Sequence, residues 1–417
     1  MKIIFTIIIV SCFITTGLTQ TDTIHQDPSV QLFYAVNKSP IYWLSSQTNI
    51  TRAEEWITAI EATKDSGLVS RKIMTGKIRT AMLNKYTKDE QIREQIDSQI
   101  TSAVLDFIKE LQQIDVHFDY DEITTATKDS VYVNQLLSSG NKGSVSKIIT
   151  ELLCQDHDYL VLKKFLQDSV PDKYSGKYKS IILSMNYLKY LSGNKQSEYI
   201  LVNIPETQLR YFRNNQLTLT MKTVVGKKKT PTPLLSSHIT NIVTLPYWNV
   251  PFSIASKELI PKIQKDEKHL KQNNFEVIDA KGNTIDDSKL NWASYNETNF
   301  PYFFREATGP QNTLGVLKFN LQNPFSIYLH DTNAKSAFSR KYRFLSHGCI
   351  RLEKPIELAS FLAEGQIDAT ALKNAKKDTE PKILKLAKKV PVFIVYMPVI
   401  VNDGKVVFLK DEYGLVK

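Results

Sequence analysis

Apolar residues in the first half of the chain recur every three or four positions, the spacing that places them on one face of a helix. A capping box at Thr51-Arg52-Ala53-Glu54 predicts the start of a helix that carries Trp56 and closes at Gly67. The longest stripe predicts one long amphipathic helix and comprises Ile92, Ile96, Ile100, Val104, Phe107 and Leu111. Two further stripes predict helices around Val145–Leu166 and Tyr178–Leu191. Residues 27–195 are therefore predicted to form a helical domain.

The hydrophobic period changes from helix-like to strand-like near Glu198. Strands are predicted at 199–204, 208–212, 217–224, 243–245, 326–329 and 392–396. Asn214-Asn215 predicts a hairpin turn, and Asn402-Asp403-Gly404 predicts another within a C-terminal hairpin at 401–417. Residues 256–313 are polar and irregular, which favours an insertion that caps a mainly β domain over 198–400. The predicted fold class is α+β, with a helical domain before a mainly β domain.

The N-terminus has the pattern of an export signal. Lys2 precedes an apolar run at 3–10, which is too short to span a bilayer, and small and polar residues follow to Gln20. Residues 1–19 are predicted to be a signal peptide cleaved after Thr19, so the mature chain would be exported from the cytoplasm. A competing interpretation takes Ile9-Val10-Ser11-Cys12 as a lipidation box, which would tether the chain to a membrane through Cys12.

Length and charge limit the possible classes of protein. A chain of 417 residues exceeds the usual size of one hydrophobic core, so two domains are expected. The formal charge of +10 favours anionic partners such as nucleic acid, a membrane surface or a wall polymer. The lysines are scattered apart from Lys227–Lys229, and no nucleic-acid-binding motif accompanies them. We therefore expect no nucleic-acid partner.

Three cysteines occur, which is too few for a disulfide framework. Cys12 would leave with the signal peptide, and Cys154 continues an apolar helical run as a buried small hydrophobe. A thiol left unpaired in an oxidising compartment is expected to have a chemical role. Cys349 is the cysteine whose neighbouring residues could support such a role.

Cys349 lies in the segment Ser346-His347-Gly348-Cys349-Ile350-Arg351, and His330 follows an apolar strand upstream. A cysteine attacks carbonyls as the thiolate, and a nearby imidazole can lower its pKa or accept its proton. Gly348 leaves room for a substrate carbonyl, and backbone N–H groups of this turn could stabilise an oxyanion. Ser346 and Arg351 flank the turn, where they could fix it or bind a substrate carboxylate.

Two structural interpretations compete with catalysis. His330, His347 and Cys349 could belong to a zinc site, but no fourth ligand accompanies them, so no metal is expected. The four residues 346–349 could also be a chance turn beside a core histidine. Papain-like peptidases are excluded by chain order, because their cysteine precedes their histidine.

These residues and their surroundings resemble the L,D-transpeptidases, whose catalytic domain is named YkuD, and among them the large YcbB-like branch with a scaffold region. His330 precedes Cys349 by nineteen residues, as that family's signature requires. Further matching blocks are Val225-Gly226-Lys227, Thr230-Pro231-Thr232-Pro233, Pro246–Pro251, Gly309–Gly315 and Tyr328–Thr332. The likeness covers nearly the whole chain after the predicted signal.

The resemblance implies roles for individual residues. Cys349 would be the nucleophile and His330 the general base and acid, oriented by a backbone carbonyl rather than by Asp331. His347 would line the site, and Gly348 with Cys349 would donate to the oxyanion. Trp248 and Tyr328 would bind substrate, although both could equally be core aromatics.

The implied activity is cross-linking of peptidoglycan stem peptides through a thioester, without any cofactor. A donor tetrapeptide would lose its terminal D-Ala and be joined 3→3 to the diamino acid of an acceptor stem. Alternatives on the same site are L,D-carboxypeptidase and D-amino-acid exchange activity, and a different class is a non-catalytic wall-binding scaffold. Carbapenems would acylate Cys349, and other wall-synthesis enzymes are possible partners.

Overall fold

The structure is a computed structural model that describes residues 27–64, 75–124, 128–139, 143–169, 172, 175–296 and 298–417. The predicted signal peptide, its cleavage site after Thr19 and Cys12 lie outside these residues. The chain forms two compact units. The first comprises Met1–Gln113, Ala126–Gln155 and Leu166–Val170, and the second comprises Ile114–Thr125, Asp156–Phe165 and Pro171–Lys417.

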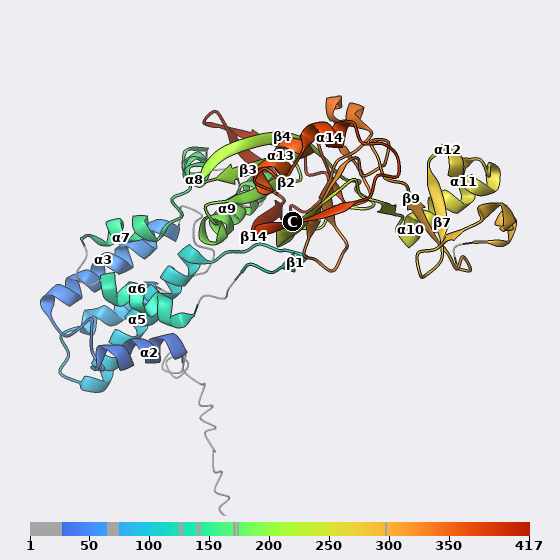
Figure 1. The fold of residues 1–417 in the computed structure, drawn as a ribbon. Coiled ribbons are helices and arrows are strands. Elements are labelled where there is room, and N and C mark those ends of the chain that lie inside the picture. The colour runs from blue at the N-terminus through green and yellow to red at the C-terminus, as the bar shows by residue number, and fades with distance from the viewer. Residues whose placement is uncertain are drawn as a thin grey trace, which may run out of the picture. The chain divides into compact units, whose positions relative to one another are not determined.

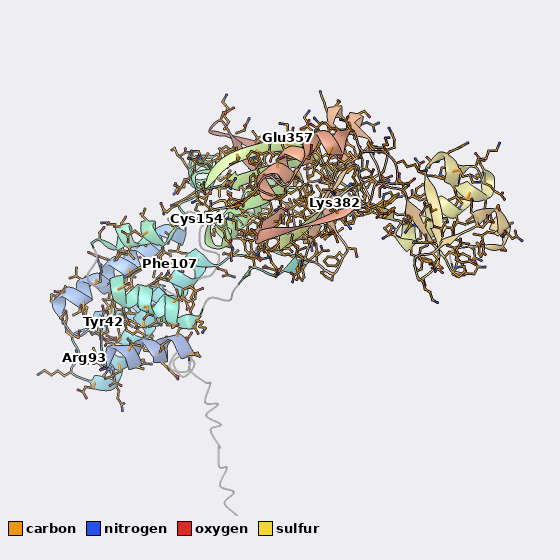
Figure 2. All side chains as sticks on the ribbon, viewed as in Figure 1. Tyr42, Arg93, Phe107, Cys154, Glu357 and Lys382 are labelled. Atoms are coloured by element: carbon orange, nitrogen blue, oxygen red, sulfur yellow. The ribbon has the colours of Figure 1, made fainter. Side chains whose placement is uncertain are left out.

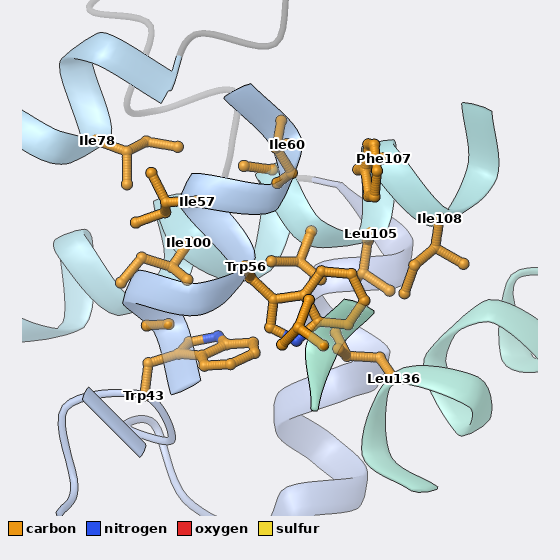
Figure 3. Close-up of a cluster of buried hydrophobic side chains, with 14 of the residues drawn as sticks. Trp43, Trp56, Ile57, Ile60, Ile78, Ile100, Leu105, Phe107, Ile108 and Leu136 are labelled. Carbon is orange, nitrogen blue, oxygen red and sulfur yellow. The ribbon is translucent and has the colours of Figure 1, made fainter. Parts of the chain in front are cut away.

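The first unit is helical, as the apolar spacing predicted (Figure 1). Its core gathers the fully buried Trp43, Trp56 and Phe107, together with isoleucines that project from several helices (Figure 3). The long stripe forms α5 and confirms the predicted helix. Helices of this unit are α2 (Pro28–Asn37), α3 (Gln47–Lys64), α4 (Thr75–Ala81), η1 (Met82–Asn84), α5 (Glu90–Gln112), α6 (Asp129–Ser139) and α7 (Val145–Leu152).

Two local predictions in this unit are wrong. Thr51 does not cap a helix, because α3 begins at Gln47 and the Thr51 hydroxyl donates to the Gln47 carbonyl one turn earlier at 3.1 Å. Cys154, labelled in Figure 2, is not in a helix, because α7 ends at Leu152, and its side chain is only half-buried. Local propensity located both helices but misplaced their ends.

Strands of the second unit close into a ring. The order β5–β10–β11–β13–β4–β3–β2–β14 returns to β5, because β14 pairs with β2 and with β5. Asn214 and Asn215 form the predicted turn between β3 and β4, both with positive φ. The strands are β1 (Tyr120–Asp121), β2 (Tyr199–Asn203), β3 (Gln208–Arg213), β4 (Gln216–Gly226), β5 (Leu235–Thr244), β10 (Leu317–Leu321), β11 (Tyr328–His330), β12 (Phe344–Ser346), β13 (Ile350–Leu352), β14 (Lys382–Val395), β15 (Val399–Asn402) and β16 (Lys405–Phe408).

The second unit also takes in segments that precede the β domain in sequence. Strand β1 pairs in parallel with β5, and the Tyr190 hydroxyl lies 2.6 Å from Ser236 Oγ. The unit boundary therefore differs from the one expected near residue 195. Its helices are α9 (Gly176–Asn194), η5 (Lys335–Ser339), α13 (Pro355–Leu362) and α14 (Ala369–Lys373), and α8 (His157–Ser169) is divided between the two units after Phe165.

A smaller sheet with its own aromatic core makes up the cap, which we define as residues 248–306 (yellow in Figure 1). Phe304 stacks on both Trp292 and Phe300 in that core, so a segment of polar, irregular composition has a packed interior of its own. Its elements are β6 (Trp248–Asn249), α10 (Phe252–Ile254), the π-helix η2 (Ala255–Leu259), α11 (Ile260–Lys265), α12 (His269–Gln272), β7 (Phe275–Ile278), β8 (Thr284–Ile285), η3 (Asp287–Lys289), η4 (Trp292–Ser294) and β9 (Phe303–Glu306).

The fold class is α+β, a helical region followed by a β-rich region, as predicted. Of the helices that the structure describes, none has both the length and the apolar character needed to cross a bilayer.

Candidate active site

The candidate nucleophile and base lie on adjacent strands of the ring. β11 and β13 run parallel, with Leu329 opposite Ile350 and His330 opposite Arg351. Leu329 and Ile350 are fully buried in the core, and successive residues of a strand face opposite sides. His330 and Cys349 therefore face the other side, where both line a cavity of about 850 Å³.

His330 is held by the backbone that follows it. Its Nδ1 is hydrogen-bonded to the carbonyl oxygen of Asp331, which meets the expectation of a backbone carbonyl as the orienting group. A carbonyl only accepts hydrogen bonds, so Nδ1 carries the proton and Nε2 keeps a basic lone pair. The side chain is 3% exposed, and burial, assisted by the charge of Arg351, lowers the pKa of His330 to about 3. The imidazole is therefore neutral at physiological pH.

Cys349 is a half-buried thiol whose sulfur lies 3.8 Å from the Ser326 carbonyl oxygen. Burial raises the pKa of Cys349 above its ordinary value, while hydrogen bonding from Tyr328 and the charges of Lys318 and Arg351 oppose this rise. A neutral imidazole and a protonated thiol that line the same cavity suit proton transfer during attack better than a preformed thiolate.

The turn before the nucleophile is fixed by Ser346. Its hydroxyl donates to the Cys349 carbonyl at 2.6 Å and accepts from the Gly348 N–H at 3.1 Å. The Gly348 N–H is thus bound within the turn, which leaves the Cys349 N–H as the better candidate for an oxyanion donor. Gly348 has φ of +123°, and a side chain there would press on Ile327 at 3.2 Å. This backbone conformation explains the glycine more directly than room for a substrate does.

A second loop braces this turn, and sequence reasoning did not assign it a role. Thr232 Oγ1 donates to the Gly348 carbonyl at 2.7 Å and accepts from the Gly226 N–H at 2.9 Å. The Tyr413 hydroxyl, near the C-terminus, donates to the Gly226 carbonyl at 2.6 Å. Thr232 and Gly226 fall in blocks that carried the family resemblance, and this was the only sequence signal for them.

The cap contributes to the same cavity. His347 Nε2 lies 2.7 Å from Glu258 Oε1 in the π-helix η2, so this contact joins the turn before Cys349 to the cap. Trp248 of β6 and Tyr328 both line the cavity, and Tyr328 lies close enough to Cys349 for the two side chains to influence each other's pKa. Both aromatics therefore face the cavity rather than a closed core.

Arg351 and Lys318 also face the cavity, and Lys318 was not singled out in the sequence. Its position opposite His330 comes from the pairing of β10 with β11, which no local motif reveals. With respect to zinc, the described residues contain no cluster of three or more His, Cys, Asp and Glu side chains suited to a metal ion.

Comparison with known proteins places both parts of the chain. Residues 197–392 match the L,D-transpeptidase catalytic domain family, YkuD, and residues 28–166 match the Scaffold domain family. A Haemophilus influenzae protein provisionally named as an L,D-transpeptidase is 32% identical over 288 residues, which cover 68% of this chain and 58% of that protein. The chain thus spans little more than half the length of this relative.

Solved structures with likeness to this chain include other L,D-transpeptidases. The catalytic domain from E. faecium, acylated by ertapenem, is 14% identical with a TM-score of 0.23, and the match covers 48% of this chain and 99% of that one. An enzyme from Mycobacterium smegmatis is 13% identical with a TM-score of 0.23, and the match covers 48% of this chain and 58% of that one. From the matches to the two family domains, the chain belongs to the L,D-transpeptidase family, in the branch that carries a scaffold domain before its YkuD catalytic domain.

Proposed function

We propose that this protein is a peptidoglycan L,D-transpeptidase that forms 3→3 cross-links through a thioester on Cys349. The observation that carries the proposal is the strand register that puts Cys349 and the neutral, basic Nε2 of His330 on one face of adjacent strands. The cavity that they line is large enough for a peptide and is bordered by the cap.

Acylation begins when Cys349 Sγ attacks the carbonyl carbon of the third residue in a donor tetrapeptide. His330 Nε2 takes the thiol proton as the carbon–sulfur bond forms. His330 then returns that proton to the departing nitrogen, so D-Ala leaves as a neutral amine and the thioester remains. General acid–base catalysis of this kind contributes about 10²–10⁴-fold.

The oxyanion of the tetrahedral intermediate is stabilised by the Cys349 N–H. Ser346 supports this donor by holding the Cys349 carbonyl and the Gly348 N–H. One oxyanion donor contributes about 3–4 kcal/mol to a transition state of this type.

Deacylation uses the side-chain amine of a second stem's diamino acid. His330 accepts a proton from that amine as it attacks the thioester, and Cys349 leaves as a thiol. The products are a cross-linked dimer and free D-Ala, so no external oxidant, reductant or cofactor takes part.

The setting follows from the proposed substrate. Peptidoglycan is outside the cytoplasm, so we infer export of this chain to the periplasm or cell envelope by residues 1–19. Mass analysis of the mature N-terminus tests this: a start at Gln20 supports cleavage after Thr19, whereas a lipidated Cys12 supports a membrane tether.

The activity test is incubation of the purified protein with tetrapeptide-bearing muropeptides and, separately, with a carbapenem. Cys349→Ala is the inactive variant, and Cys154→Ala, in the helical unit, is the matched control. We expect D-Ala release, dimers and a covalent carbapenem adduct with the wild type and Cys154→Ala only. D-Ala without dimers would instead support carboxypeptidase or exchange activity, and no adduct with no D-Ala would leave a non-catalytic scaffold.

A further inference from the structure

Two cationic side chains flank the candidate base in a single row across three strands. Lys318 of β10 pairs with His330 of β11, and His330 pairs with Arg351 of β13. Paired residues on neighbouring strands present their side chains on the same face. Lys318 and Arg351 therefore share the face of His330, and all three line the cavity that holds Cys349.

Neither cation has an acidic partner. Among the ion pairs of the described residues, none involves Lys318 or Arg351, and Arg351 Nε is buried without a hydrogen-bond partner. Burial lowers the pKa of Lys318 and of Arg351, and a thiolate at Cys349 would oppose this in both cases. Unpaired charges are costly to bury, which favours an anion arriving from outside.

Lys318 is also held in place before any anion arrives. Its ammonium lies 4.3 Å from the centre of the Tyr328 ring, a cation–π contact that stabilises a charge without neutralising it. Tyr328 in turn contacts Cys349. The ammonium is therefore anchored beside the nucleophile while its charge stays available.

We propose that Lys318 and Arg351 form a carboxylate-binding subsite that holds the C-terminal carboxylate of the donor stem peptide beside Cys349. The choice of this carboxylate rests on the proposed function. In a donor tetrapeptide the scissile nitrogen belongs to the terminal D-Ala, whose carboxylate is one residue, or about 3.5 Å, farther along the chain. Neighbouring strands are about 4.8 Å apart, so a carbonyl at Cys349 places that carboxylate within reach of the row.

The subsite explains selection for stems that end at D-Ala. A fifth residue would convert the carboxylate into a neutral amide and remove the anion from the two cations. The charges of Lys318 and Arg351 also help to keep His330 neutral and lower the pKa of Cys349. A test of the subsite therefore has to separate anion binding from these effects on the pKa of His330 and Cys349.

Alkylation of Cys349 by two haloacetates separates binding from tuning. Iodoacetate and iodoacetamide each react with the thiolate with loss of iodide, but only iodoacetate carries a carboxylate. A change in the thiol pKa alters both rates equally, so the ratio of rates at the Cys349 peptide, followed by mass spectrometry, reports anion binding. We expect Lys318→Met to lower the iodoacetate-to-iodoacetamide ratio about fivefold or more, and Lys318→Arg to restore it.

Lys335→Met is the matched control, because it also removes a positive charge that acts on His330, but from a lysine paired with Asp331. We expect Lys335→Met to change the iodoacetate-to-iodoacetamide ratio less than about twofold, because solvent and salt screen an exposed charge that acts from a distance. Thermal unfolding of every variant verifies that the fold is retained. An unchanged ratio in folded Lys318→Met, or an equal fall in Lys335→Met, would overturn the subsite.

A donor tetrapeptide and its C-terminal amide connect the subsite to the reaction. Wild type should release D-Ala at least about tenfold faster than D-Ala amide, and Lys318→Met should lose most of that preference. Equal release of both products by the wild type would refute the subsite and leave the proposed function intact. If neither is released while the haloacetate ratio still depends on Lys318, the proposed function fails and the anion subsite stands.

Discussion

The Nδ1–H of His330 donates to the backbone carbonyl of Asp331, although the carboxylate of Asp331 is also close in sequence. That carboxylate is used elsewhere, because it accepts from the Val316 N–H at 3.0 Å and forms an ion pair with Lys335. The His330 imidazole is therefore oriented by the main chain, and the Asp331 carboxylate supports the segment that leads into β10.

Asp331→Asn and His330→Gln should consequently differ greatly in effect. The asparagine keeps an acceptor for Val316 and leaves the Asp331 carbonyl in place, so we expect acylation within about threefold of wild type and a stability loss of about 1 kcal/mol. His330→Gln removes the base, and we expect a loss of about 10²–10⁴-fold in acylation by a tetrapeptide donor. Single-turnover kinetics measure both variants. A loss in Asp331→Asn as large as in His330→Gln would show that the carboxylate takes part.

The buried, neutral His330 should also make stability depend on pH. Its pKa is about 3 in the folded protein, against about 6.5 in an unfolded chain, so only the unfolded state binds this proton between those values. Stability from this group is fully present above about pH 6.5 and decreases as the pH falls toward 3. At pH 5 the decrease is about 2 kcal/mol. Denaturant unfolding at pH 7 and pH 5 should therefore show a smaller acid loss for His330→Gln than for wild type, and equal losses would contradict burial of a neutral imidazole.

Regular periodicity predicted the elements whose apolar faces are continuous. Helices α5 and α9 and strands β2 to β4 were found in this way. The first half of β14 carries exposed lysines, and Ser236, Ser237 and His238 follow the first residue of β5, so the sequence predicted only the apolar end of each strand. The polar composition of residues 256–313 predicts an insertion but not its helices and strands, because its core depends on aromatic contacts that composition does not reveal.

The residues of the candidate site likewise form two groups, those that the sequence identified and those that it did not. His330, Cys349 and Arg351 could be selected because they fall in or near one short motif. Lys318, Thr232 and Tyr413 reach the site only through strand pairing and loop contacts, which local sequence does not encode. Burial, which decides the protonation of His330, likewise depends on the complete fold.

The hydrogen bonds by which Thr232 and Tyr413 hold the turn before Cys349 should affect the rate of acylation more than the stability of the fold. Thr232→Val keeps the shape of the side chain but loses the bonds to the Gly348 carbonyl and the Gly226 N–H. We expect acylation by a carbapenem to slow about tenfold, because small displacements of a nucleophile are costly. Tyr413→Phe should act in the same direction and more weakly, since it loses the bonds with the Gly226 carbonyl and the Thr232 N–H but leaves the Thr232 hydroxyl on the Gly348 carbonyl.

Tyr342→Phe is the control for Tyr413→Phe, because Tyr342 is exposed and its hydroxyl bonds to Glu412 rather than to Gly226 or Thr232. We expect its acylation rate to match that of wild type. Stopped-flow fluorescence of carbapenem acylation measures these rates. If Thr232→Val acylates at the wild-type rate, the loop does not position Cys349.

The contact between Glu258 and His347 should hold the cap over the cavity. Glu258 lies in a π-helix, a feature often found at functional sites, and both side chains are partly exposed. An exposed ion pair contributes only about 0.2–1 kcal/mol, so Glu258→Gln should barely change global stability. It should instead speed amide hydrogen exchange in residues 252–265 and raise the KM for the donor about threefold. Glu267→Gln, another exposed carboxylate of the cap, is the control and should change neither quantity. Exchange rates in 252–265 that stay at wild-type values in Glu258→Gln would show that this contact does not restrain the cap.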